Sequence, residues 1–314
     1  MNIYEPRYTN EKAAREHLES VRWPDGPFCP HCGSFNAKRL PPVARAATAK
    51  HSATVRDGVV QCNEKACRKQ YTVTVGTVFE RSKVPLFKWL LVNHLMVASK
   101  KGISAHQIHR MIGVTYKTAW FMCHRIREAM DQKDEGPLGG SPEIVIEADE
   151  TYVGGLAKNR PFGAPIPVKR IVVTLVERGG RARSFHIANA HANIIRPLLF
   201  QHADRLSTLM TDELKAYKGA GEGFWQHQTV KHREGQYGKK GGWNTNTVEN
   251  FFSIFKRGII GVYHHVSEAH LGRYATEFDF RYSHRNVTDG ERADASLAGI
   301  FGKRLMYRRP RWAA

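Results

Sequence analysis

The chain has 314 residues and is strongly basic, with 48 Lys and Arg residues against 29 Asp and Glu residues and a formal net charge of +19. This length suffices for roughly two or three domains, and the charge favours nucleic acid as a partner, because neutralised phosphates release counterions. No apolar run reaches the roughly 18 residues of a membrane span, and the N-terminus lacks the apolar core of a signal peptide, so we expect a cytosolic protein.

Four of the five cysteines form two close pairs near the N-terminus, Cys29 with Cys32 and Cys62 with Cys67. In a reducing compartment such pairs predict metal binding rather than disulfides, and four thiolates complete the tetrahedral shell of one zinc ion. The Pro- and Ala-rich segment 40–55 between the pairs indicates an insertion. The sequence therefore predicts a zinc ribbon that is stabilised by structural Zn²⁺.

Two further patterns follow the cysteines. Alternation of apolar residues and threonines over residues 71–75 predicts a strand of the ribbon. Apolar residues at helical spacing between Leu86 and Val97 predict a core helix, with Pro85 as its first residue.

Segment 102–130 predicts two short helices, capped by Ser104 and Thr115 and joined by a turn at Gly113, which is typical of a helix-turn-helix. The expected buried residues are Ile108, Met111 and Ile112 in the first helix and Ala119, Met122, Cys123 and Ile126 in the second. The residues that we expect on the DNA-binding face of the second helix are Tyr116, Lys117, His124 and Arg125, beside Arg127. An ordinary helical hairpin produces the same pattern and remains the alternative.

A second periodic region begins after the polar linker 132–142. Strands are predicted over 144–148, 170–176, 184–188 and 207–211, with a helix over 194–203 before the last of them. Asp149 follows the first strand and Asp212 follows the last, so their carboxylates can converge on hard divalent cations if the two strands are neighbours. Each aspartate alone is more often a turn or cap residue.

The residues beside Asp149 receive simpler interpretations. Side chains alternate along a strand, so Glu147 shares the face of Asp149. We expect it to lie beside the metal ligands without binding the metal itself. Glu150 lies on the opposite face, where we expect it to be solvated or salt-bridged.

A later helix offers a third carboxylate. Glu249 lies at the edge of a buried stripe, and Lys256 follows it on the same face about two turns or ~10 Å away, where it can hold a DNA phosphate. Asn246 and Asn250 are alternatives for the third position, and Arg257 stands seven residues after Asn250.

Together these motifs resemble the bacterial insertion-sequence transposases of the DDE type that carry an N-terminal zinc ribbon. The segments that carry the resemblance include "CPHCG", "EADETYVGG", "TDELKAY" and "TNTVENFFSIFKRG". The order of three strands, a helix and a fourth strand is that of the ribonuclease-H-like fold. Asn244 departs from the pattern, because a His is expected before "TN".

The resemblance implies a transposase that binds the terminal inverted repeats of its insertion sequence and catalyses strand cleavage and strand transfer. It implies two catalytic Mg²⁺ or Mn²⁺ ions, with Asp149 and Asp212 as ligands and Glu249 as the third, beside Lys256. It also implies double-stranded DNA as partner, both transposon ends and target, a homo-oligomer on DNA, and a nucleoid-associated location in the bacterial cytoplasm. A non-catalytic DNA-binding regulator and a ribonuclease or junction nuclease are the alternatives.

The expected fold class is α/β, a ribonuclease-H-like catalytic domain with a mixed sheet and flanking helices, preceded by a small zinc ribbon and a helix-turn-helix domain. The expected domain limits are 1–82 for the zinc ribbon with an N-terminal helix, 83–131 for the helix-turn-helix domain, 132–142 for the linker, 143–290 for the catalytic domain and 291–314 for a basic C-terminal tail.

Overall fold

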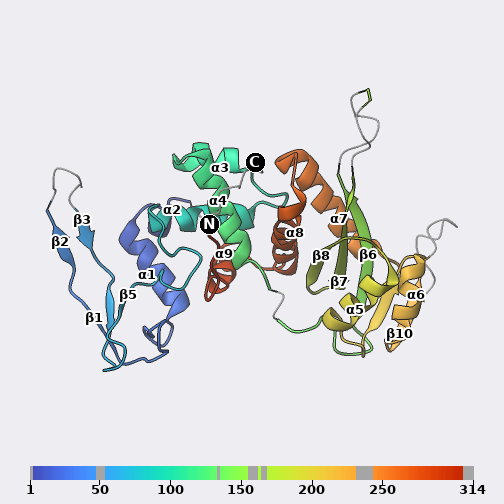
Figure 1. Ribbon diagram of the computed structural model, residues 1–314, viewed down its shortest axis with the longest axis horizontal. Helices are drawn as coiled ribbons and strands as arrows, with labels where there is room; N and C mark the ends of the chain where they lie inside the picture. The colour runs from blue at the N-terminus through green and yellow to red at the C-terminus, as the bar shows by residue number, and fades with distance from the viewer. Residues whose placement is uncertain are drawn as a thin grey trace, which may run out of the picture. The chain divides into compact units, whose positions relative to one another are not determined.

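Two compact units make up the structure, a computed structural model that describes residues 3–46, 54–132, 135–154, 162–163, 168–230 and 243–306 (Figure 1). The first unit comprises Met1–Ala98, Ala105–Met130 and Thr288–Ala314, and the second comprises Ser99–Ser104 and Asp131–Val287. None of the described helices is long and apolar enough to cross a membrane.

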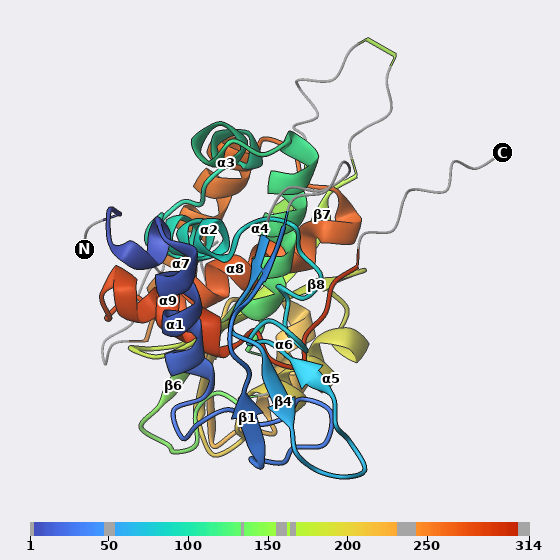
Figure 2. The same ribbon diagram turned by 90° about the vertical axis from the view of Figure 1, so that its left-hand side faces the viewer.

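The N-terminal part of the first unit contains a small antiparallel sheet with the strand order β1-β4-β5. Strands β1 and β4 of this sheet are labelled in Figure 2. Its elements are the turn η1 (Pro6–Tyr8), the helix α1 (Glu11–Arg22) and the strands β1 (Ala37–Arg39), β4 (Val60–Cys62) and β5 (Gln70–Tyr71). The expected insertion is a separate antiparallel hairpin of β2 (Val43–Arg45) and β3 (Thr54–Arg56). The hairpin lies in sequence between the two cysteine pairs, as predicted.

Strand β5 is shorter than the alternation over residues 71–75 predicted. Tyr71 and Val73 are buried as expected, but the backbone leaves the strand after Tyr71 and forms turns. The buried guanidinium of Arg22 donates to the carbonyl oxygens of Val73 and Val75. These carbonyls therefore have a hydrogen-bond partner without a neighbouring strand, which is what a buried backbone group requires.

The later helices of the first unit are α2 (Leu86–Ala98), α3 (Ala105–Ile112), α4 (Tyr116–Ala129) and α9 (Asp289–Ala298). Helix α9 occupies the beginning of the basic tail expected over 291–314, so that part of the prediction was wrong. Asn93 of α2 donates to the carbonyl of Ala293 at 3.0 Å, and Ser296 donates to the Asn93 amide oxygen at 2.7 Å. Ile300 is buried as well, and only the last part of the expected tail, residues 307–314, lies outside the described residues.

Helices α3 and α4 follow the predicted pair closely. Gly113 joins them with a φ of +64°, a left-handed conformation that glycine adopts without steric cost, and the Thr115 hydroxyl caps α4. Ile108 and Ile112 are buried, but Met111 is 51% exposed, which corrects the predicted stripe. Each residue turns a helix by about 100°, so Met111 and Ile112 cannot both face the same narrow partner surface.

The second unit is built on a five-stranded mixed sheet with the order β10-β9-β6-β7-β8. Its strands are β6 (Val145–Val153), β7 (Arg170–Glu177), β8 (Ala182–Ile187), β9 (Thr208–Thr211) and β10 (Gln226–Thr229). Strands β6, β7 and β8 pair antiparallel, whereas β9 is parallel to β6 and β10 is parallel to β9. The structure confirms the four predicted strands, but β6 continues to Val153, so Asp149 lies within this strand rather than after it as expected. Strand β10 was not predicted.

Helices cover both faces of this sheet through two apolar clusters. Ile146 and Ala148 of β6 pack in a cluster with α5 (Ala192–His202) and α6 (Lys215–Gly221). On the opposite face, Val172 and Val176 of β7 pack with α7 (Asn246–Gly258) and α8 (Glu268–Ser283). The odd-numbered residues of β6 therefore face α7, because neighbouring side chains alternate between the faces.

The second half of the expected linker is part of the second unit. Leu138 is fully buried in the cluster of α5 and α6, and its backbone N–H donates to the carbonyl of His202 at 2.8 Å. The segment around Leu138 is thus an edge of the folded unit rather than a free connection.

Candidate functional site

The register of two parallel strands brings the predicted aspartates together. Ala148 of β6 pairs with Thr211 of β9, and each is followed directly by an aspartate, Asp149 in one strand and Asp212 after the other. Carboxylate oxygens of Asp149, Asp212 and Glu150 all lie within 4.8 Å of one another. We call these three residues the acid group.

Glu150 was not expected in this group. It lies on the face of α6, opposite to Asp149, as the alternation predicted, but it is only partly exposed and accepts a hydrogen bond from the hydroxyl of Tyr217 at 3.1 Å. Burial and the neighbouring carboxylates raise the pKa of Tyr217 well above its usual value, so the hydroxyl keeps its proton and donates. The expectation of a merely solvated or salt-bridged Glu150 was therefore wrong.

The acid group concentrates negative charge in a partly buried place. Burial, followed by the charges of Glu150 and Asp212, raises the pKa of Asp149 from 3.8 to about 7. The pKa of Glu150 is also raised, first by burial and then by Asp212. Carboxylates so close together repel one another, and a divalent cation removes that repulsion, so the donor set fits hard metal ions.

Glu147 ties β6 to the beginning of α7. Its carboxylate is fully buried and accepts from the Thr247 N–H at 2.8 Å, the Thr247 hydroxyl at 2.8 Å and the Val248 N–H at 2.9 Å. Arg178 donates its Nε–H to the same carboxylate at 2.5 Å. These bonds satisfy backbone donors that a helix start leaves unpaired, and a negative charge there is favourable.

Arg178 also explains the place of Asn244, the departure from the expected His. One guanidinium nitrogen of Arg178 donates to the Asn244 carbonyl oxygen at 2.7 Å and to its side-chain oxygen at 3.3 Å. Asn244 therefore belongs to the contacts that hold the start of α7.

Helix α7 carries Glu249 in its first turn. Glu249 is exposed, accepts from the Thr245 hydroxyl at 3.0 Å, and contributes to the raised pKa of Asp149 after the larger effects of burial and the nearer acids. It does not join the acid group within 4.8 Å. The alternatives Asn246 and Asn250 are exposed on the same helix.

Lys256 and Arg257 lie in the last turn of α7, where both are exposed. The seven-residue offset from Glu249 puts Lys256 on the same side of the helix, about two turns further on.

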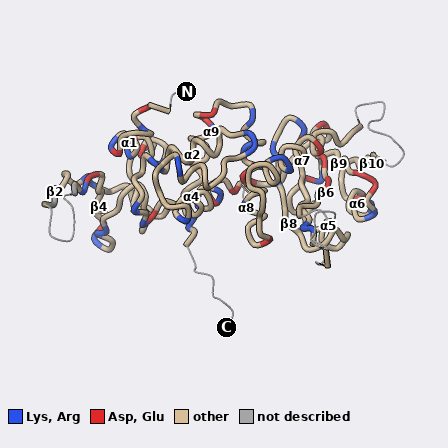
Figure 3. The backbone as a smooth tube through the Cα atoms, turned by 90° about the horizontal axis from the view of Figure 1, so that it is seen from above, with Lys and Arg blue, Asp and Glu red and all other residues tan. Residues whose placement is uncertain are grey.

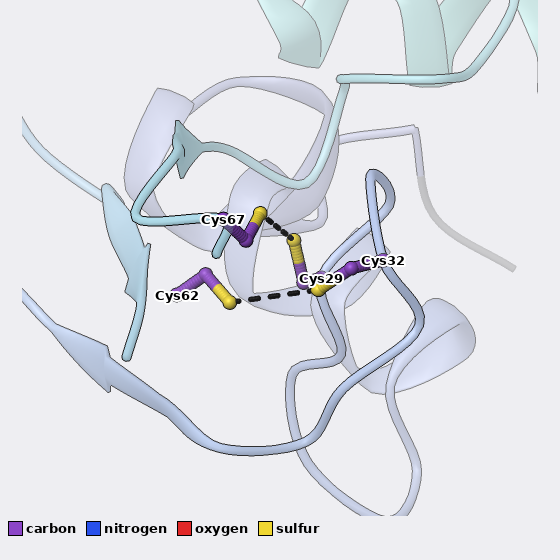
Figure 4. A group of neighbouring side chains, drawn as sticks. All are labelled: Cys29, Cys32, Cys62 and Cys67. Carbon is purple, nitrogen blue, oxygen red and sulfur yellow. Dashed lines mark hydrogen bonds between the residues drawn. The ribbon is translucent and has the colours of Figure 1, made fainter. Parts of the chain in front are cut away.

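The four paired cysteines form a second group of metal-binding side chains, in the first unit (Figure 4). The sulfur of Cys29 lies 3.7 Å from that of Cys67, and the sulfur of Cys32 lies 3.6 Å from that of Cys62. A zinc ion with Zn–S bonds of about 2.3 Å in a tetrahedral shell separates its sulfurs by about 3.8 Å. The geometry therefore fits the structural zinc ion that the spacing predicted.

The expected DNA-binding face of α4 is only partly exposed. Tyr116 is 43% exposed and stacks on His106, and Lys117 is exposed as well. His124 and Arg125 are buried, and Arg125 donates to the carbonyl of Glu80 at 2.7 Å. The prediction that these two side chains are free to face DNA was therefore wrong, because residues outside the helix pair cover the second half of α4.

Two contributors to the site were assigned no role from the sequence. Arg178 stands in the turn after β7 and belongs to no spacing pattern that predicts a site, whereas Tyr217 of α6 ends the quoted segment "TDELKAY", in which only Asp212 was assigned a role. Both act through partners more than 30 residues away in the chain, so only the folded structure relates them to the acids.

Comparison with known proteins gives a consistent result. Residues 137–283 match the model of the ISXO2-like transposase domain, and residues 9–70 match that of a transposase zinc-ribbon domain. The chain is 26% identical over 299 residues to an uncharacterised protein in transposable element ISH50 of Halobacterium salinarum. The matched region covers 87% of this chain and 91% of the relative. The acid group and Glu249 fall in the first matched segment, and the four cysteines fall in the second.

Proposed function

Because the chain belongs to the insertion-sequence transposases that combine a transposase zinc ribbon with an ISXO2-like transposase domain, we propose that it binds terminal inverted repeats, cuts DNA there and joins the freed ends to target DNA. The observation that carries the proposal is the acid group of Asp149, Glu150 and Asp212, inside a chain of net charge +19. Carboxylates repel phosphates, so at a DNA-processing centre they need divalent cations between them and the substrate.

The catalytic fold that we propose is ribonuclease-H-like. Its support is the strand order, with three antiparallel strands in succession, a helix, and then two parallel strands on the other side of the first strand. This arrangement puts the first and fourth strands side by side. Asp149 and Asp212 directly follow the paired residues Ala148 and Thr211, so even their short side chains come close to each other.

We assign Asp149 and Asp212 as ligands of two Mg²⁺ or Mn²⁺ ions, with Glu249 as the third ligand. When bound, such ions activate the attacking oxygen, first of water and then of a 3′-hydroxyl, and stabilise the leaving oxygen of the phosphodiester. Glu249 is preferred to Asn246 and Asn250 because its carboxylate offers a divalent cation a charged oxygen ligand, which a neutral amide does not. Glu147 and Arg178 hold the start of α7, and Lys256 binds a phosphate of the DNA.

The remaining DNA contacts are proposed for exposed cations and aromatic groups. Lys and Arg occur along both units (Figure 3). In our assignment α3 and α4 act as a helix-turn-helix whose Tyr116 and Lys117 reach the major groove, while Lys256 and Arg257 bind the backbone near the acids. The cysteine cluster holds Zn²⁺ and stabilises the ribbon, and the protein acts as a homo-oligomer on DNA.

The test is metal-dependent cleavage and joining of DNA that carries the inverted repeats flanking the gene. The expected result is that Asp149→Asn and Asp212→Asn each abolish joining while binding to the repeats stays close to wild type. Glu222→Gln is the matched control, because Glu222 is an exposed acid of the same unit.

Two outcomes of this test would each favour a different function. Binding of the repeats without any Mg²⁺-dependent cleavage favours a non-catalytic regulator, and cleavage that ignores the repeat sequence favours a nuclease. Wild-type joining by either Asp→Asn variant refutes the assigned site.

A further inference from the structure

A hollow on the surface of the second unit lies at the C-terminal end of α7. Its volume is about 490 Å³, which is within the range of small-ligand sites. We call it the α7 hollow, and the residues that line it are Lys101, Lys256, Arg257, Ile260, Gly261 and Val262.

The α7 hollow combines an apolar wall with positive charge. Ile260 is 70% exposed and lines the hollow together with Val262. The charged lining residues are two lysines and one arginine, and none of the residues that line the hollow is acidic. The ligand that matches this lining is an anion with an apolar body.

The apolar wall is held from inside the unit by the π turn η4 (Ile259–Tyr263). The hydroxyl of Tyr263 donates to the fully buried Glu277 at 2.7 Å, and the ring of Tyr263 packs on Tyr274 with centroids 4.6 Å apart. Isolated π turns often occur at functional sites. Within this turn Ile259 is buried in the core, whereas Ile260 is exposed at the surface.

Both ends of η4 are also constrained. A Cβ atom on Gly258 would lie 2.6 Å from the carbonyl oxygen of Lys101, so only glycine permits this close approach of α7 to the segment that contributes Lys101. His264, directly after the turn, has a φ of +58°. This conformation is unfavourable for any residue that has a side chain. Ile260 is therefore presented by a fixed backbone rather than by a loose loop.

The hollow is related to the acids through one helix. Lys256 lines it and lies on the same side of α7 as Glu249, about two turns or ~10 Å away. A strand of B-form DNA rises about 3.4 Å per nucleotide, so about three nucleotides span this distance and a strand bound at the acids can reach the hollow.

We propose that the α7 hollow takes one unstacked nucleotide of the transposon-end DNA, next to the strand that is cut. Ile260 contacts the apolar face of its base, and Lys101, Lys256 and Arg257 bind the phosphates on either side. A duplex that touched only the cations would leave Ile260 against polar groups, whereas an unstacked base buries it. This inference rests on the proposed function, because it takes end DNA as the substrate.

The experiment uses inverted-repeat DNA with 2-aminopurine at successive positions of the end and its flank, bound to the full chain. Fluorescence of this base rises when it leaves the stack. The expected result is a rise at one or two adjacent positions on binding, which Ile260→Ala abolishes while weakening end binding about tenfold. Leu206→Ala is the matched control, because Leu206 is 58% exposed in the same unit but does not line the hollow.

A second variant separates the cations from the apolar wall. Lys101→Ala is expected to lower the slope of log affinity against log salt by about 1, whereas Ile260→Ala leaves the slope unchanged. If the wild-type chain binds and cuts end DNA without any rise in fluorescence, the nucleotide proposed for the α7 hollow is overturned, whereas the proposed function is not. The same holds if Ile260→Ala retains the full rise, and a chain that binds no end DNA overturns the proposed function as well.

Discussion

The four cysteines come from two turns of one small sheet, whereas the acid group comes from two strands of a larger sheet that are far apart in the sequence. In the cysteine cluster, four thiolates complete the zinc shell and leave no position for a substrate. In the acid group, three carboxylates leave positions open for water and phosphate. A complete shell suits a metal that stabilises the fold, and an open one suits a metal that takes part in the reaction.

The two sites also differ in what the metal does for stability. Without zinc, the small sheet loses the ligand bonds that bring its two turns together. Without divalent cations, the second unit keeps its apolar clusters on both sheet faces and suffers only the mutual repulsion of the acids. Three changes test this difference.

The largest effect is expected from Cys62→Ser or from removal of zinc. The ribbon loses on the order of 10 kcal/mol of metal-linked folding free energy. Hydrogen exchange of the full chain is expected to lose protection over β1, β4 and β5 but not over β6 and β7. The comparison variant Asp149→Asn leaves protection in all five strands, and equal protection of the ribbon with and without zinc would contradict a structural metal.

A smaller effect is expected from Glu147→Gln, which removes the buried charge that pairs with Arg178 and caps α7. Breaking such a pair costs roughly 3–5 kcal/mol locally. We expect faster hydrogen exchange in the first turn of α7 and about tenfold more Mn²⁺ needed for half-maximal joining, because Glu249 is held less firmly.

The control for this change is Glu143→Gln, an exposed acid just before the same strand. A double variant with Glu249→Gln separates positioning from general loss of stability. If Glu147 acts through Glu249, the double variant joins DNA no more slowly than Glu249→Gln alone. Additive losses would contradict that role.

The smallest effect concerns pH. The folded-state pKa of Asp149 is raised from 3.8 to about 7, so between these values the folded chain holds a proton that the unfolded chain releases. This stabilising contribution is fully present below pH 3.8 and is lost as the pH rises through about 7. Thermal unfolding without added Mg²⁺ or Mn²⁺ is expected to report the loss.

Asp149→Asn is the control for the pH effect, because it removes the titrating group and flattens this part of the profile. Added Mn²⁺ is expected to restore stability above pH 7 in the wild type only. A wild-type profile that matches that of Asp149→Asn would show that repulsion among the acids has no effect on stability.

Much of both sites follows from local patterns. The spacing of Cys29, Cys32, Cys62 and Cys67 predicts the cysteine cluster, because two short turns bring each pair together whatever the rest of the fold does. Asp149 and Asp212 are recognisable because each directly follows a short apolar run in the sequence. The capping box of Thr288 and Glu291 was also visible as T-x-x-E and predicts the start of α9, which the expected basic tail obscured.

The errors share one physical cause. Helical periodicity predicts which residues share a face of α3 or α4, but it does not say which neighbour covers that face. Arg125 therefore looked free for DNA although it is buried beside Trp89 and bonded to a backbone carbonyl of the first unit. The prediction that Met111 is buried was wrong for the converse reason, since no neighbour in the described structure covers this side chain fully.

The sequence by itself determined the basic charge, the cysteine spacing, the helix pair and the two aspartates, because each depends on residue type or on a local repeat. The tertiary structure decided the pairing of Ala148 with Thr211, and with it the meeting of Asp149, Glu150 and Asp212. It also decided that Glu147 caps α7 and that Ile260 stands exposed among cations. These relations depend on strand order and helix packing, which bring together residues that no local pattern connects.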